Sequence, residues 1–157
     1  MAGRTLSNVD IENYYKGNPH WGGVHMRDEF ATMKLEDKFY IANLDDSTGP
    51  GTHWTLIFNV PIPDDNPDLT IYADSYGVYP PNDVLAFLRQ SHRPMVYTSD
   101  QYQSLDSTAC GWFCCYIADQ LLLSVKYEKL FDGTLREHQY AKNEKAVTHK
   151  ALQKALR

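Results

Sequence analysis

The sequence lacks the features that define several large classes of protein. No apolar run approaches the ~20 residues that a membrane-spanning helix needs, and Met1–Asn13 lacks the basic-then-apolar pattern of a secretory signal. Only three cysteines occur, at positions 110, 114 and 115, which excludes a disulfide framework and does not match the spacing of a zinc site. We therefore expect a protein of a reducing compartment that is neither secreted nor embedded in a membrane.

Basic charge is also scarce, with 15 Lys and Arg against 20 Asp and Glu and a net charge of −5. This balance argues against nucleic acid as the main ligand, because phosphate binding needs a basic face. A row of basic residues near the C-terminus could dock a partner, but such rows are more often solvated helix faces. Its members are Lys142, Lys145, Lys150, Lys154 and Arg157.

What the sequence does contain is enough apolar material for a core. Apolar residues make up 43% of the chain, which includes 3 Trp, 11 Tyr and 6 Phe. A length of 157 residues fits one compact domain and leaves no room for two ordinary ones. We therefore expect a single domain over residues 1–157 that works as a monomer.

The hydrophobic pattern predicts short strands followed by helices. Strands are expected over Phe39–Leu44, His53–Val60, Leu69–Ala73 and Met95–Thr98. Helices are expected over Val9–Lys16 (with Asn8 as its cap), Asn82–Gln90, Cys110–Val125 and, from its helical spacing, Ala141–Arg157. Loops or turns are expected over Trp21–Val24, Asp45–Gly51 and Pro61–Pro67. This order predicts an α+β domain with a mostly antiparallel sheet packed on a buried helix that begins near Cys110.

Cys110 stands where a polar loop runs directly into the longest apolar helix. A helix amino end carries a partial positive charge and unpaired N–H groups, which favour a thiolate and can stabilise an oxyanion. Gly111 would let a substrate backbone approach without a Cβ in the way. The alternative for any cysteine is a buried structural role, and this is our interpretation of Cys114 and Cys115.

A thiolate nucleophile needs a base, and the base needs an orienting group. His53 starts the strongest predicted strand and Asp74 ends another, so both would lie at rigid strand ends. A strand-terminal Asp is also common in turns. His53, Asp74 and Cys110 are acceptable zinc ligands by type, but no closely spaced ligand pair accompanies them, and we expect no metal.

At these positions the sequence resembles a known family. The segments Gly51–Trp54 and Ala73–Gly77, followed by Gln103 seven residues before Cys110-Gly111, resemble the adenovirus maturation protease and its relatives. These belong to one clan with the cysteine proteases that remove SUMO and other ubiquitin-like modifiers. The resemblance covers about half of the chain. It implies a papain-like fold in which the catalytic residues occur in a rearranged order.

The resemblance also implies roles by position. Cys110 resembles the nucleophile, and His53 resembles the base that later protonates the leaving amine. Asp74 occupies the position of the group that orients the imidazole. Gln103 occupies the oxyanion position, together with the backbone N–H of Cys110. Trp54 follows the base, as in many relatives, and would shield the cysteine–histidine pair.

Relatives in this clan prefer glycine near the cleaved bond and enforce it with a narrow aromatic tunnel. We predict Trp21, Gly22 and Gly23 as part of that groove, although a glycine turn beside a core Trp fits the same residues. The adenovirus enzyme is activated by DNA and by a peptide held through a disulfide. This chain has no cysteine outside 110–115 for such a link, so no cofactor is expected.

The resemblance therefore favours a compact maturation protease of a virus, virophage or mobile element, which cleaves capsid or virion precursors near glycine. Such a protein would act in the virion, the host cytoplasm or a viral factory. A protease that removes SUMO-like or ubiquitin-like modifiers is the alternative, although the chain is short for one. A domain that keeps the fold for binding but has no activity is the third interpretation.

Overall fold

The computed structural model describes residues 5–45, 53–61 and 69–156, and the expected turns Asp45–Gly51 and Pro61–Pro67 lie largely outside these ranges. The strands are β1 (Trp21–Met26), β2 (Phe39–Asn43), β3 (Trp54–Phe58), β4 (Thr70–Ala73) and β5 (Met95–Tyr97). The α-helices are α1 (Asn8–Tyr15), α2 (Asn82–Leu88), α3 (Cys110–Leu122), α4 (Tyr127–Lys129), α5 (Tyr140–Val147) and α6 (Lys150–Ala155). A 3₁₀ helix, η1, covers Arg27–Thr32, and a π-helical turn, η2, covers Leu130–Thr134.

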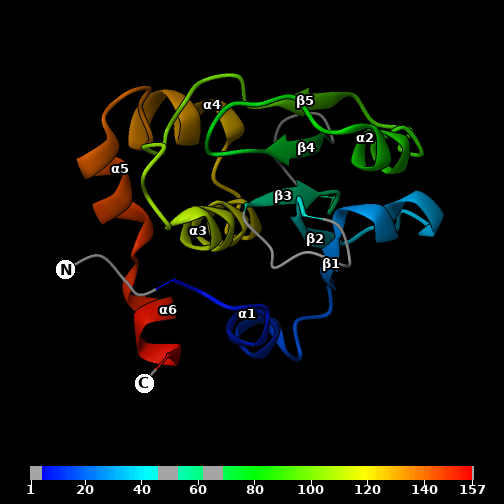
Figure 1. Cartoon of the computed structure of the whole chain (residues 1–157), viewed down its shortest axis with the longest axis horizontal. Coiled ribbons are helices and arrows are strands. Elements are labelled where there is room, and N and C mark those ends of the chain that lie inside the picture. Colours follow the sequence, from blue (N-terminus) through cyan, green and yellow to red (C-terminus); the bar gives the residue numbers. More distant parts are fainter. Residues whose placement is uncertain (1–4, 46–52, 62–68, 157) are drawn as a thin grey trace.

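The described strands form one sheet in the order β1-β2-β3-β4-β5 (Figure 1). The three central strands pair antiparallel, whereas β1 pairs with β2 and β5 pairs with β4 in parallel. The predicted α+β class is confirmed, and the antiparallel prediction holds for the central strands only. The parallel β4–β5 pair requires a crossover, which α2 supplies between the two strands.

The predicted loop over Trp21–Val24 is wrong, because these residues begin strand β1. The two glycines that suggested a loop instead lie in an irregular edge strand, at positions where other residues would not fit. A Cβ at Gly22 would lie 2.3 Å from Cε2 of Tyr40, and Gly23 has a φ of +100°, which L side chains rarely adopt. The register between β1 and β2 shifts between Trp21 and Val24, as in a β-bulge.

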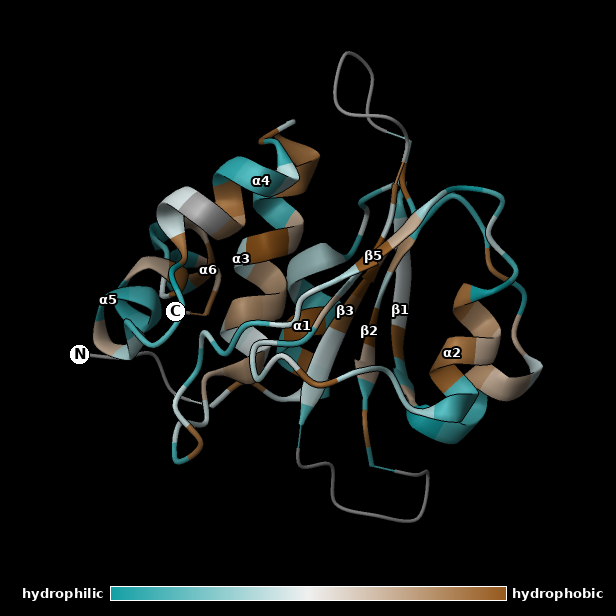
Figure 2. Cartoon of the chain, turned by 90° about the horizontal axis from the view of Figure 1, so that it is seen from above, coloured by the Kyte–Doolittle hydropathy of each residue, from teal (hydrophilic) through white to brown (hydrophobic). Residues whose placement is uncertain are grey.

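Side chains alternate between the two faces of the sheet along each strand, and helices cover both faces, so both faces are buried. Leu56 and Phe58 of β3 join a core with α1 and α3, while Ile57 between them joins a second core with α2 and η1. Figure 2 shows α2 on one side of the sheet and the other α-helices on the opposite side. None of the helices in the described part of the chain has the length and apolar character that crossing a bilayer requires.

Helix boundaries differ from the prediction where local hydrogen bonds decide them. Ser7 caps α1 in place of Asn8: its Oγ accepts from the N–H of Asp10 at 3.1 Å, and the Asp10 carboxylate accepts from the N–H of Ser7 at 2.8 Å. Helix α3 begins at Cys110 as predicted but stops at Leu122, and Ser124 turns the chain with a φ of 65°. The C-terminal helical segment is divided into α5 and α6.

One polar cluster ties α1 and the start of α6 to α3. The carboxylate of Asp119 on α3 accepts from the hydroxyls of Tyr14 at 2.5 Å and Tyr15 at 2.8 Å, and it lies 2.8 Å from Nε2 of His149. Nδ1 of His149 lies 2.8 Å from the carbonyl of Val147. Both ring nitrogens face acceptors, which suits the doubly protonated ring. Burial, the largest single effect, lowers the pKa of His149, but the hydrogen bonds to Asp119 and Val147 and the charge of Asp119 together outweigh it and raise the pKa.

Candidate active site

Cys110 is the first residue of α3 and is half-buried. The residue before it, Ala109, gives the helix no side-chain cap, so the first-turn N–H groups are not satisfied by a capping side chain. Cys114, one turn further on, is 2% exposed, and Cys115 is fully buried. Burial also raises the pKa of both inner thiols. Of the three cysteines, Cys110 is the most exposed.

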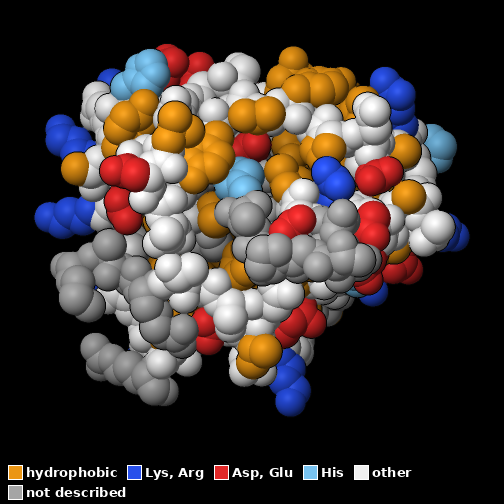
Figure 3. All heavy atoms as spheres, viewed as in Figure 1, with side chains coloured by type: hydrophobic (Ala, Val, Ile, Leu, Met, Phe, Trp, Pro, Cys, Tyr) orange, Lys and Arg blue, Asp and Glu red, His pale blue; other side chains and the backbone are white. Residues whose placement is uncertain are grey.

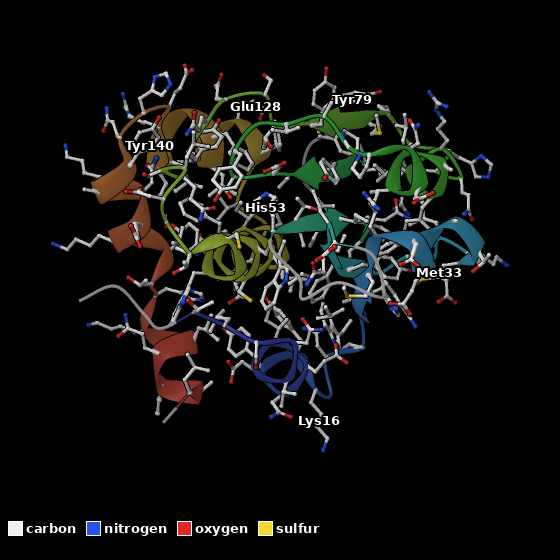
Figure 4. All side chains as sticks on the ribbon, in the orientation of Figure 1. Lys16, Met33, His53, Tyr79, Glu128 and Tyr140 are labelled. Carbon is white, nitrogen blue, oxygen red and sulfur yellow. The ribbon has the colours of Figure 1, made fainter. Side chains whose placement is uncertain are left out.

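His53 and Asp74 meet across the ends of two neighbouring strands. His53 directly precedes β3 and Asp74 directly follows β4, and these strands pair antiparallel with Leu56 opposite Ala73. Nε2 of His53 lies 2.7 Å from Oδ1 of Asp74. The His53 side chain is 13% exposed and that of Asp74 only 1%. Figure 4 labels His53 in the middle of the molecule, between α3 and β3.

The other ring nitrogen of His53, Nδ1, is not bonded to Asp74. Nδ1 is buried and makes no hydrogen bond to any residue in the described ranges. Burial lowers the pKa of His53, but the hydrogen bond with Asp74 and the interaction with the Cys110 side chain outweigh burial and raise the pKa to about 9. The imidazole is therefore protonated at neutral pH.

Tyr76, which no local sequence pattern singles out, forms one wall of this site. Its ring stacks on that of His53 with centroids 4.3 Å apart and an interplanar angle of 23°. Its backbone N–H donates to Oδ1 of Asp74 at 2.8 Å, and its hydroxyl donates to the carbonyl of Ser107 at 3.3 Å. Continuing the β3–β4 register past Ala73 puts residue 76 opposite residue 53, so the strand pairing was the signal that could have found it.

Gln103 is buried between the turn after β4 and the loop before α3, with an exposed fraction of 1%. Its Nε2 donates to the carbonyl of Ser107 at 3.0 Å, and its Oε1 accepts from the hydroxyl of Ser75. Its backbone N–H donates to the carbonyl of Ser75 at 3.0 Å. The Gln103 amide is therefore held between the turn that carries Asp74 and the loop that leads to Cys110.

Of the residues predicted to contact substrate, Trp54 and Gly111 lie against each other. A Cβ at Gly111 would lie 2.8 Å from Cε3 of Trp54 and 3.2 Å from Cβ of Leu6. Trp54 is only 8% exposed. The absent Cβ of Gly111 thus makes room for the Trp54 ring against α3, which gives both residues a packing role at the site.

The structure does not bring Trp21, Gly22 and Gly23 to the site. Trp21 pairs with Phe39 at the start of β2, and Phe39 pairs with Phe58 at the end of β3, whereas His53 precedes the start of β3. The beginning of β1 therefore lies at the opposite end of the sheet. The ring of Trp21 instead packs on Phe39, with centroids 5.1 Å apart.

Figure 3 shows hydrophobic side chains gathered on this face of the molecule. In the view of Figure 3, a histidine side chain reaches the surface near the centre of this face, among hydrophobic side chains. Within the described residues, no group of three or more His, Cys, Asp or Glu side chains is arranged to hold a metal ion. The imidazole of His53 contacts the Asp74 carboxylate, and the Gln103 amide is bonded to Ser75, the residue after Asp74. A thiol, an imidazole, a carboxylate and an amide are the groups that acyl transfer by a cysteine uses.

Comparisons with known proteins bear on the fold. No protein-family model matches the chain, and no curated protein matches it. The crystal structure of the ASFV pS273R protease resembles it with a TM-score of 0.66 and 17% identity, over 92% of this chain and 66% of that one. A selenomethionine structure of the same protease gives a TM-score of 0.50 and 23% identity, over 92% and 53%.

The chain shares its fold with this protease. The likeness spans nearly all of this chain but less than two thirds of that protease. At this level of identity it establishes the fold alone. The predicted fold class is thereby confirmed, and the chemistry of the site has to be argued from its own residues.

Proposed function

We propose that this chain is a cysteine endopeptidase in which Cys110 is the nucleophile and His53 the general base and acid. The proposal rests above all on one observation: a partly buried histidine lies 2.7 Å from the Asp74 carboxylate, and a half-buried cysteine at the start of a helix is among the groups that raise the pKa of that histidine. The likeness to the ASFV pS273R protease supports it at the level of the fold.

In the proposed reaction the Cys110 thiolate attacks the carbonyl carbon of the scissile peptide bond. The negative charge that develops on the carbonyl oxygen is stabilised by the backbone N–H of Cys110 and by an N–H of Gln103. His53 then gives its proton to the leaving amine, which breaks the C–N bond and leaves a thioester on Cys110. Water, deprotonated by His53, attacks the thioester and releases the acid product.

Two neighbouring residues hold the imidazole of His53 in position in this scheme. Asp74 accepts from Nε2 of His53, which fixes the tautomer and directs Nδ1 toward Cys110. The Tyr76 ring covers one face of the imidazole, which keeps the ring in its plane and limits water on that side.

For the substrate, we propose virion or capsid precursor proteins cleaved near glycine. The ordered set His53, Asp74, Gln103 and Cys110 in a small chain, with the resemblance described above, supports this choice. Candidate capsid precursors incubated with the purified protein should give discrete cuts, and sequencing of the new termini should place glycine beside each cut. Cys110→Ala should abolish the cuts, whereas Cys114→Ala, which alters a buried thiol of the same helix, should retain them.

The same preparation separates the alternatives. Covalent labelling of Cys110 by a ubiquitin-like modifier that carries a C-terminal electrophile, without precursor cleavage, would favour a modifier-removing protease. An alkylation rate at Cys110 no faster than that of a free thiol near pH 7 would favour a binding domain without activity. Unchanged precursor cleavage by Cys110→Ala would exclude Cys110 as the nucleophile.

A further inference from the structure

The turn that follows β4 contacts both halves of the candidate site. Asp74 in this turn bonds His53, and the next residue, Ser75, bonds Gln103. Ser75 is 4% exposed, and its carbonyl accepts from the backbone N–H groups of Tyr102 at 2.8 Å and Gln103 at 3.0 Å. Backbone and side-chain bonds together thus fasten the Gln103 segment to this turn.

The two partners of the Gln103 amide determine which way it points. The Ser107 carbonyl can only accept, so the nitrogen end of the amide must face it, and Nε2 lies 3.0 Å away. The oxygen end then faces Ser75, whose hydroxyl donates to Oε1. One of the two N–H groups on Nε2 is used by Ser107. The second N–H makes no hydrogen bond to the residues that the structure describes, so it is available to an oxyanion.

We propose that Ser75 is a positioning residue that holds the Gln103 amide in the orientation that stabilises the oxyanion. This inference rests on the proposed function. Without the Ser75 hydroxyl, Oε1 would be a buried acceptor without its donor, and the amide would be held at one end only. Gln103 could then rotate about its terminal bond, and its free N–H would no longer be fixed where the charge develops.

The test compares two reactions of the same thiol. Acyl transfer from p-nitrophenyl acetate to Cys110 passes through an oxyanion, whereas alkylation by iodoacetamide displaces iodide at a methylene carbon and forms none. Ser75→Ala should lower kcat/KM for acyl transfer at least about fivefold, but by less than the ~10²–10³ that removing an oxyanion donor costs. Its alkylation rate should equal that of the wild type. Ser104→Ala is the matched control, because Ser104 bonds Asp106 in the adjoining loop and should leave both rates unchanged.

A second set of variants tests whether Ser75 acts through Gln103. Gln103→Ala should lower acyl transfer more than Ser75→Ala does, and adding Ser75→Ala to Gln103→Ala should cause no further loss. Equal losses of acyl transfer and alkylation in Ser75→Ala would indicate a general structural role and overturn the inference. Additive losses in the double variant, or full acyl transfer by either single variant, would also overturn it.

The same measurements distinguish a failure of the Ser75 positioning role from a failure of the proposed protease function. If the wild type transfers no acyl group, or transfers it equally well after Cys110→Ala, the proposed protease chemistry is wrong. If the wild type transfers acyl groups through Cys110 and Ser75→Ala does so at the same rate, only the positioning role of Ser75 is wrong.

Discussion

Replacing Asp74 by asparagine should move the alkaline limit of activity to lower pH. The carboxylate lies 2.7 Å from the ring of His53, and with Cys110 it raises the pKa of that ring from 6.5 to about 9 against the effect of burial. At about 1.4 kcal/mol for each tenfold change, this difference corresponds to about 3 kcal/mol in favour of the protonated ring. Asparagine keeps the shape and one acceptor oxygen but removes the charge.

The expected result follows from the need for a protonated imidazole to release the amine. With a pKa near 9, about nine tenths of the His53 rings are protonated at pH 8. If Asp74→Asn returns the pKa to about 6.5, the protonated fraction at pH 8 falls about thirtyfold. Peptide cleavage at pH 8 should fall by a similar factor, and less near pH 6.

Two measurements check this prediction. The pH profile of kcat/KM for a cleaved precursor peptide gives the alkaline limit, and NMR titration of the His53 ring proton gives its pKa directly. Asp37→Asn is the control, because Asp37 pairs with Arg93 and its side chain is 71% exposed. An alkaline limit in Asp74→Asn that coincides with that of the wild type would refute the argument that Asp74 holds the proton on His53.

Three further predictions concern neighbouring contacts. Gly111→Ala places a Cβ 2.8 Å from the Trp54 ring and should lower the free energy of unfolding by about 1–3 kcal/mol in denaturant titrations. The pKa of His149 is raised by folding, so its ion pair with Asp119 stabilises the folded state fully below pH 6.5, and this stabilisation is lost as the pH rises through the folded-state pKa. His149→Ala should therefore lower the free energy of unfolding by about 1–3 kcal/mol near pH 6 and by less near pH 9. Tyr76→Leu removes the ring stacked on His53 and should slow peptide cleavage about two- to tenfold, and an unchanged kcat would contradict the role given to stacking.

The fold was predictable wherever the local pattern was strong. The central strands and α3 lie close to the expected ranges, because runs of β-branched and aromatic residues, or a long apolar segment after a polar loop, leave few other structures open. Strand β1 was missed because Gly22 and Gly23 read locally as a loop. The neighbouring Tyr40 ring, which fills the space of a Cβ at Gly22, explains the first glycine in an edge strand, and the φ of +100° explains the second.

The amino-acid sequence by itself determined the chemical groups of the candidate site and the elements that carry them. A cysteine at a helix start, a histidine before a strand and an aspartate after another strand can all be recognised from local patterns, because helix and strand ends depend on nearby residues. Which ring nitrogen of His53 bonds Asp74, and which residues Ser75 and Tyr76 contact, depended on strand register and on hydrogen bonds between distant segments. These relations arise only when β3, β4 and the loop before α3 pack together, so they belong to the tertiary structure.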